Sequence, residues 1–180
     1  MPIALARTRG GLPRAVALVA LAALVAGCAR AAATAGDSGR APAPGAPCMA
    51  TDQDRYVWDP TRLQLVRPCV YVTGTIATAV DLNSDGDRTF LVRLDARYQN
   101  LLQPSNVEGG VRGLDVEAVC NVPSVIPAVL ALCSGDAHPY LGAVPPVGTH
   151  VWLEGRYIFD LHHESHAELH PLYRMGTLAP

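Results

Sequence analysis

Alternation of apolar and polar side chains constrains the fold of this chain more than any other feature of its sequence. In the stretch VYVTGTIATAV, one face of an extended strand would carry four apolar residues: Val70, Val72, Ile76 and Val80. Gly74 interrupts the stretch and predicts a bulge or a sharp bend in that strand. A strand with one apolar face must bury that face against other strands, so we expect a mainly β fold.

Four further segments alternate in the same way, at residues 88–95, 114–120, 149–160 and 166–171. The side chains that we expect to face the core are Phe90, Val92, Leu94, Leu114, Val116, Ala118, Val151, Leu153, Tyr157, Phe159, Ala167 and Leu169. Residues 160–165 precede the last segment, and their polar composition predicts a turn.

A short helix is predicted between the third and fourth strands, in the stretch SVIPAVLALC. Ser124 can cap it, and Pro127 falls in its first turn, where a missing N–H costs little. The predicted order is therefore β-β-β-α-β-β. This is the order of a small five-stranded OB-like barrel, whose helix plugs the barrel between the third and fourth strands.

The N-terminus has the features of an export signal. Basic residues precede the apolar run AVALVALAALVA, which is too short to span a bilayer as a helix. The following LVAGC resembles a bacterial lipobox, which predicts a signal peptide at residues 1–27 and lipidation of Cys28. Ordinary cleavage nearby, leaving a free Cys28, is the alternative. We expect an Ala/Gly/Pro-rich tether at 28–47, a folded domain at 48–180, and a lipid-anchored location on the extracytoplasmic face of a bacterial membrane.

The charge of the predicted mature chain disfavours nucleic acid as a partner. The sequence has no lysine, and removing residues 1–27 leaves 11 arginines against 16 acidic residues, a formal charge of −5. Binding a nucleic-acid backbone needs clustered positive charge, which this chain lacks.

Four cysteines remain after Cys28, and their even number in an exported domain predicts two disulfides. We expect the nearest neighbours to pair, Cys48 with Cys69 and Cys120 with Cys133, although four cysteines allow three pairings. A zinc site on cysteines is the weaker alternative, because no Cys-x-x-Cys spacing is present.

The C-terminal stretch DLHHESHAELHP holds four of the six histidines and is the first candidate site. If residues 166–171 form a strand, His166, Glu168 and His170 share its outward face, which is a zinc-competent set of side chains. The outer two would lie roughly 13 Å apart at the backbone, so a neighbouring strand would have to supply a further ligand. The alternative is a solvated polar face in which Glu168 and His170 make structural hydrogen bonds. Trp152, expected on the outward face of the fourth strand, is the aromatic side chain best placed to stack on a ligand beside Glu168 and His170. The alternative for Trp152 is partial burial under the N-terminal segment.

Other catalytic and metal patterns are weak. The stretch DLNSDGD matches the first half of a calcium loop, but Val92 occupies the position of the bidentate glutamate, so a β-hairpin turn explains it more simply. The zinc-protease pattern fails because Ala167 occupies the position of its second histidine, and no Gly-x-Ser-x-Gly motif is present. We therefore predict no catalytic residue and no obligatory cofactor, with zinc as the one possible metal.

Three stretches together resemble a group of small exported bacterial lipoproteins: DPTRLQLVRPCVYVTGTI, DGDRTFLVRLDARYQNLL and VGTHVWLEGRYIFD followed by HAELHP. The resemblance implies an OB-like barrel and names no biochemical activity. Two positions depart from the group's pattern, where His166 replaces a usual tryptophan and Thr89 a frequent histidine. A site that used those two side chains would be altered in this protein.

Taken together, these features predict a non-catalytic binding or structural module at the cell envelope. The lipid on Cys28 would bind the membrane, and the expected envelope ligand is a saccharide, a peptide or another protein. The alternative is a metal-binding protein or metal-dependent hydrolase that uses His166, Glu168 and His170.

Overall fold

The computed structural model describes residues 53–133, 140 and 142–179, all within one compact unit of the chain, residues 34–180. The predicted signal segment, Cys28, the tether and Cys48 lie outside the described residues. Within the described part of the chain, no helix has the length and apolar character needed to cross a membrane.

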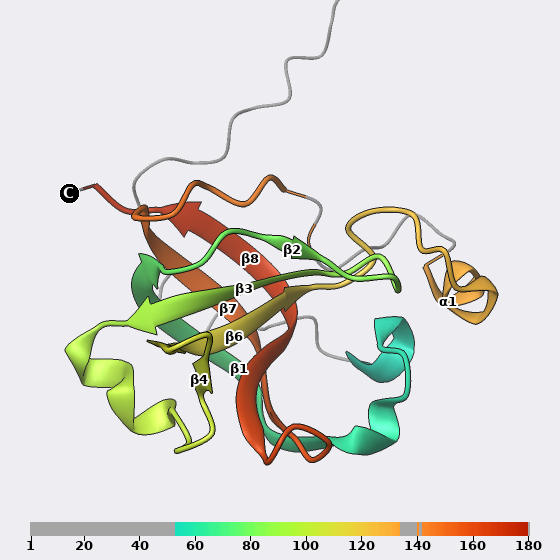
Figure 1. Cartoon of the computed structure of the whole chain (residues 1–180), viewed down its shortest axis with the longest axis horizontal. Helices are drawn as coiled ribbons and strands as arrows, with labels where there is room; N and C mark the ends of the chain where they lie inside the picture. Colours follow the sequence, from blue (N-terminus) through green and yellow to red (C-terminus); the bar gives the residue numbers. More distant parts are fainter. Residues whose placement is uncertain (1–52, 134–139, 141, 180) are drawn as a thin grey trace, which may run out of the picture. The chain divides into compact units, whose positions relative to one another are not determined.

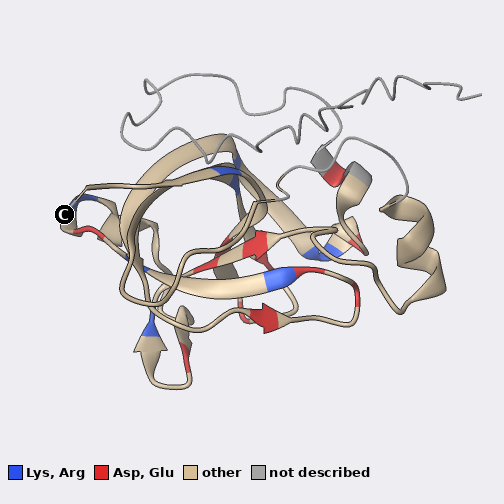
Figure 2. Cartoon of the chain, turned by 90° about the horizontal axis from the view of Figure 1, so that it is seen from above, with Lys and Arg blue, Asp and Glu red and all other residues tan. Residues whose placement is uncertain are grey.

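Five strands close into a small barrel: β1 (Leu63–Ile76), β3 (Arg88–Leu94), β6 (Leu114–Ala118), β7 (His150–Asp160) and β8 (His166–Thr177). Their order around the barrel is β1-β7-β8-β6-β3, and β3 pairs again with β1 (Figures 1 and 2). Every pairing among these five strands is antiparallel except that of β6 with β8, which is parallel. The fold is the predicted five-stranded OB-like barrel.

Shorter elements occupy the connections. They are the 3₁₀ helices η1 (Gln53–Tyr56), η2 (Pro60–Arg62) and η3 (Ala96–Leu101), the short strands β2 (Asp81–Leu82), β4 (Val107–Glu108) and β5 (Val111–Arg112), and the helix α1 (Pro127–Leu132). β2 pairs antiparallel with β3, so the DLNSDGD stretch is a hairpin connection, as the simpler interpretation predicted. β4 and β5 form a separate two-stranded hairpin before β6.

Barrel closure brings β1, β3 and β7 close together at Gly74. This residue pairs with Val151 of β7 on one side and with Leu94 of β3 on the other. A Cβ atom at Gly74 would lie 2.5 Å from the carbonyl oxygen of Arg93, so no other residue fits where the strands approach this closely. Gly74 thus lies where β1 pairs with two neighbours at once. The irregularities in the pairing of β1 with β7 fall at residues 65–70 instead, so the bulge or bend at Gly74 stays a prediction.

The core fills the inside of the barrel with the residues that strand alternation predicted. The main cluster takes Val70, Val72, Ile76, Phe90, Val92, Leu94, Leu114, Val116, Ala118, Val151, Leu153, Tyr157, Ala167 and Leu169 from the strands, and Val80 and Phe159 pack against it. Leu101 and Leu102, from η3 and the residue after it, complete this cluster.

The helix departs from its predicted role. α1 begins at Pro127 and contributes no residue to the main core cluster, and it lies to one side of the barrel (Figure 1). Ser124 does not cap it: the Ser124 hydroxyl accepts a hydrogen bond from the Ile126 N–H at 2.9 Å and donates to the Ser84 carbonyl at 3.0 Å. Ser124 therefore attaches the segment before the helix to the loop after β2.

A disulfide joins Cys120, just after β6, to Cys133, just after α1, with their Cα atoms 5.4 Å apart. This is one of the two predicted pairs. It closes the segment that carries α1, for which the chain-entropy model gives a stabilisation of about 3 kcal/mol. Cys69 is also disulfide-bonded, and its predicted partner, Cys48, lies outside the described residues.

Candidate binding groove and buried carboxylate cluster

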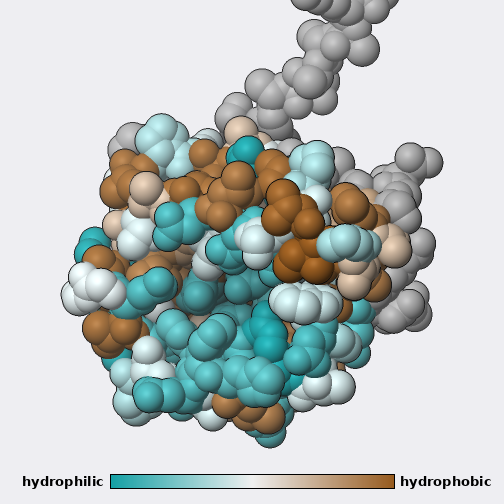
Figure 3. Space-filling view, turned by 45° about the vertical axis from the view of Figure 1, so that its right-hand side comes forward, coloured by the Kyte–Doolittle hydropathy of each residue, from teal (hydrophilic) through white to brown (hydrophobic). Residues whose placement is uncertain are grey.

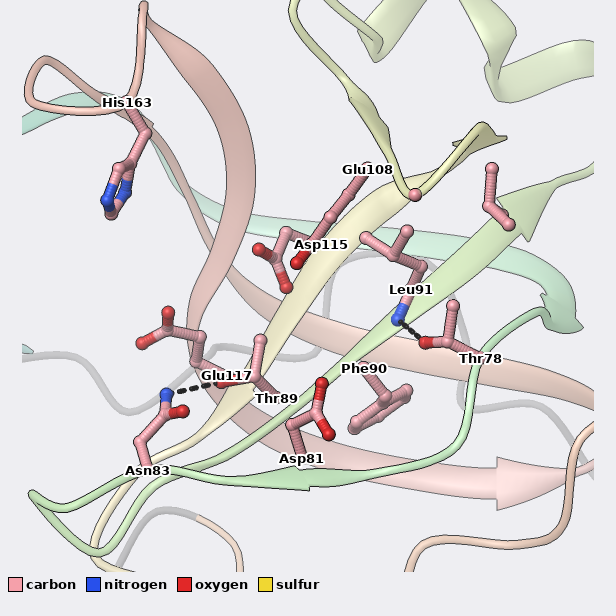
Figure 4. A pocket seen from close by; sticks show the side chains of 12 residues that line it. Thr78, Asp81, Asn83, Thr89, Phe90, Leu91, Glu108, Asp115, Glu117 and His163 are labelled. Carbon is pink, nitrogen blue, oxygen red and sulfur yellow. Dashed lines mark hydrogen bonds between the residues drawn. The ribbon is translucent and has the colours of Figure 1, made fainter.

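A cavity of about 380 Å³ opens on the outer face of β3 and β6. It is lined by the segment 78–83, by β3 and β6, by the β4–β5 hairpin and by the turn at 161–165 (Figure 4). The lining residues are Thr78, Asp81, Asn83, Thr89, Phe90, Leu91, Glu108, Gly109, Val111, Asp115, Glu117 and His163. A hydrophilic hollow is visible on this side of the molecule (Figure 3).

A second cavity, of about 440 Å³, lies next to the first and shares Glu108, Asp115 and His163 with it. Its other lining residues are Ser105, Val107, His162, Glu164 and His166. We refer to the two cavities together as the groove. Three of the four histidines of DLHHESHAELHP border it. The turn predicted at 160–165 spans residues 161–165, because Asp160 still belongs to β7, and it forms one wall of the groove.

Three carboxylates meet beneath the groove. Asp115 and Glu117 are two residues apart on β6, so their side chains share its outer face. Glu168 on β8 is the register partner of Asp115 in the parallel pair. An oxygen atom of each lies within 4.8 Å of an oxygen of the other two. These three residues are called the carboxylate trio. Glu168 is 1% exposed and Asp115 is 8% exposed, so the trio is largely removed from solvent.

His170 lies beside the trio and pairs with two of its members. Its Nδ1 atom is 2.9 Å from Oε2 of Glu117 and 3.2 Å from Oε2 of Glu168. Burial alone would lower the pKa of His170, but the charges of Glu117 and Glu168 and their hydrogen bonds raise this pKa to about 10. His170 is thus a buried imidazolium that partly neutralises the trio.

The expected exposure of Glu168 and His170 is wrong, since each is 1% exposed. Alternation correctly placed them on the outside of the barrel strand, opposite Ala167 and Leu169. Their side of the strand is covered, however, because β8 pairs with β6 and the groove walls rise on either side.

Asp115 is the member of the trio whose charge is least compensated. Its Oδ1 atom is buried and has no hydrogen-bond partner among the described residues. Burial raises the pKa of Asp115 well above its usual range, and the neighbouring Glu117 and Glu168 raise it further. Burial and Glu117 likewise raise the pKa of Asp87 to about 7. Carboxylates therefore outnumber cations in this region of the protein.

Asp160, at the end of β7, is also buried but is fully engaged. It forms an ion pair with Arg62 and accepts a hydrogen bond from the His162 N–H at 2.8 Å. Its second oxygen lies 2.9 Å from Nδ1 of His163. These contacts hold the turn at 161–165 in place, so the role of Asp160 is to position one wall of the groove.

The residues predicted as a metal site do not gather into one cluster. Among the described residues, three groups of three side chains lie close enough to share a metal ion. Glu168 and His170 never occur in the same group, and no group contains His166. His166 lines the second cavity, and burial lowers the pKa of its imidazole. Nδ1 of His170 is already engaged by Glu117 and Glu168. Zinc at His166, Glu168 and His170 stays a prediction without support from the geometry.

Trp152 is buried and lines neither cavity. Its ring stacks on Tyr71 with centroids 6.2 Å apart, and Gly176 packs against its indole. The predicted role of Trp152 as a stacking platform beside Glu168 and His170 therefore has no support in this arrangement.

The alternation of residues 114–120 puts Asp115 and Glu117 on the face opposite the predicted inward residues Leu114 and Val116, but it does not connect them with Glu168. The connection depends on the parallel pairing of β6 with β8, for which neither strand carries a local signal. The available signal was the fold itself, because OB barrels bind ligands across their second and third strands, which in this protein are β3 and β6.

Comparison of the chain with family models and with curated proteins gives no match. The resemblance of its three stretches to small exported lipoproteins accordingly stays a prediction.

Proposed function

We propose that the protein is a non-catalytic binding module, held at the cell envelope by a lipid on Cys28, whose groove binds a positively charged segment of a peptide or protein. The groove lies where OB barrels bind their ligands, on the second and third strands between the flanking loops. This correspondence of fold supports binding at the groove and leaves the ligand's chemistry to the side chains.

The observation that carries the proposal is the charge of the groove lining. Four carboxylates line it on the side of the first cavity, namely Asp81, Glu108, Asp115 and Glu117, and Glu164 borders the second. Among the described residues that line the two cavities there is no arginine. A groove with one sign of charge concentrates ligands of the opposite sign, so a basic segment is favoured and a nucleic acid is repelled.

A saccharide is less well supported as the ligand. Sugar rings commonly rest on an exposed aromatic face. Apart from the His163 imidazole, the described lining of the first cavity contains one aromatic ring, that of Phe90, and Phe90 is 1% exposed. The described lining of the second cavity contains histidines but no phenylalanine, tyrosine or tryptophan. The groove is thus built for charge and hydrogen bonding.

The test is a binding titration with fluorescein-labelled hexa-arginine, followed by fluorescence anisotropy at low salt in EDTA buffer. A hexaglutamate peptide and a Gly/Ser peptide of the same length serve as comparisons. We expect saturable binding of hexa-arginine alone, and weaker binding as salt rises, because salt screens exposed charges.

Groove variants locate the binding. The double variant Asp81→Asn/Glu108→Gln should weaken hexa-arginine binding by about tenfold, given roughly 0.2–1 kcal/mol for each exposed ion pair. The matched control is Asp59→Asn, which removes one exposed charge outside the groove and should change affinity less than twofold. Equal effects of the groove and control variants, or equal binding of the three peptides, would overturn the proposal.

A further inference from the structure

We propose that Asp115, Glu117 and Glu168 form a binding site for a hard divalent cation, with calcium the best suited, at the floor of the groove. The site differs from the zinc set predicted from the sequence, because it uses β6 and excludes both His166 and His170. It stands independently of the peptide proposed for the groove above it.

The first support is the spacing of the oxygen atoms. One oxygen from each member of the trio lies within 4.8 Å of the other two. Calcium binds oxygen ligands at about 2.4 Å, so two ligands of one ion are separated by up to about twice that distance. One ion can therefore contact all three carboxylates without a change in the strands that carry them.

The second support is independent of the clustering and concerns Asp115 alone. This side chain is 8% exposed, and its buried Oδ1 has no hydrogen-bond partner among the described residues. Figure 4 shows the Asp115 carboxylate directed into the cavity. A buried carboxylate oxygen without a donor is costly in a folded protein, and a cation is a partner that would satisfy it.

The ligand chemistry selects the class of ion. The trio offers carboxylate oxygens only, which suit calcium, magnesium and manganese rather than zinc or copper. Calcium takes six to eight oxygens in flexible geometry, whereas magnesium requires a near-ideal octahedron. Three carboxylates fixed by two strands suit the more tolerant ion, and the cavity that Asp115 and Glu117 line gives water access to the remaining positions.

Two neighbouring sets of potential ligands are less suitable. The set of Asp87, Glu117 and His170 includes a histidine whose Nδ1 already pairs with two carboxylates. The set of Asp160, His163 and Glu168 includes an aspartate that is engaged by Arg62 and by the turn. Of these three sets of described residues, the trio alone combines oxygen ligands with an unpartnered buried oxygen.

The test is calorimetric titration of the full chain with calcium chloride after removal of metals with EDTA. We expect one calcium per chain in the wild type, and a rise in the thermal unfolding midpoint on adding calcium, because a ligand that binds only the folded state stabilises it. Asp115→Asn, which conserves shape, should weaken calcium binding at least tenfold and abolish the thermal shift. The matched control Asp59→Asn removes an exposed charge that lines neither cavity, and it should change the calcium affinity less than threefold.

Near-ultraviolet circular dichroism reports whether each variant is folded. If Asp115→Asn does not fold, Glu117→Gln replaces it, with the same loss of binding expected. No heat of binding up to millimolar calcium in the wild type would overturn the site, and so would equal affinity in wild type and a folded trio variant. The peptide titration is done in EDTA, so its outcome and that of the calcium titration are distinguishable.

Discussion

Asp160 and Asp115 are both buried carboxylates, but they differ in how their charge is compensated. Asp160, at the end of β7, is fully buried and is surrounded by Arg62, the His162 N–H and the His163 ring. Asp115, on β6, is nearly as buried, but its Oδ1 atom has no hydrogen-bond partner among the described residues. Its neighbours are two further carboxylates, Glu117 and Glu168.

The difference separates a structural carboxylate from one available to a ligand. A buried carboxylate that is paired with a cation and accepts enough hydrogen bonds has a structural role. Its removal leaves the partner charge buried and uncompensated. A buried charge without such partners must take a proton or an external cation. Both regions border the same groove. Asp160 holds the turn that forms one wall of it, whereas Asp115 lies at its floor with an oxygen that has no partner among the described residues.

The largest expected effect is at Asp160. Asp160→Asn leaves the Arg62 guanidinium without its anion and should lower the free energy of unfolding by about 3 kcal/mol, the low end for breaking a buried ion pair. Urea unfolding at pH 7 with the disulfides intact measures this value. A loss below about 1 kcal/mol, the range of an exposed pair, would show that Asp160 is no more compensated than a surface carboxylate.

The opposite sign is expected at Asp87, which borders the uncompensated region. Its pKa is about 7 in the folded protein, against about 3.9 when unfolded. The folded state therefore binds its proton more tightly, and the contribution of Asp87 to stability falls as pH rises from about 4 to about 7. Asp87→Asn removes this loss while its amide oxygen can still accept from the Cys120 N–H.

We expect Asp87→Asn to have near wild-type stability at pH 4 and to be more stable than wild type by about 2 kcal/mol at pH 8. Urea unfolding in EDTA buffer at both pH values measures the difference. A variant that is less stable than wild type at pH 8 would place Asp87 with the compensated carboxylates such as Asp160.

The smallest effect is expected at Asp95, a half-exposed carboxylate at the end of β3. Partial burial would raise its pKa, but hydrogen bonds from Thr73 and His150 and the charges of His150 and Arg97 lower it below the usual value. Its stabilising contribution is therefore present above about pH 4 and is lost as pH falls through the folded pKa.

Because Asp95 and His150 are both partly exposed, solvent screens their interaction. Asp95→Asn should cost less than about 1 kcal/mol at pH 6, and less still at pH 3. The pH dependence of the urea midpoint for variant and wild type tests this. A larger cost at pH 3 than at pH 6 would contradict the expected direction of the pKa shift.

Most of the barrel could be predicted from local patterns. Alternation in residues 88–95 and 149–160 identified strands and their inward faces, since the direction of a side chain relative to its neighbours is a local property of an extended chain. The nearest-neighbour rule found the Cys120–Cys133 disulfide. The helix existed where it was expected, but its packing against the core could not be read from its own residues.

The candidate site could be predicted only in part, because its members come from separate segments. The sequence by itself determined that Glu168 and His170 point away from Ala167 and Leu169, and that Asp115 and Glu117 point away from Leu114 and Val116. Only the tertiary structure decided that these two outward faces meet and become covered. Parallel pairing of β6 with β8 joins strands that are distant in the chain, and the burial and charge of a side chain depend on such neighbours rather than on its own strand.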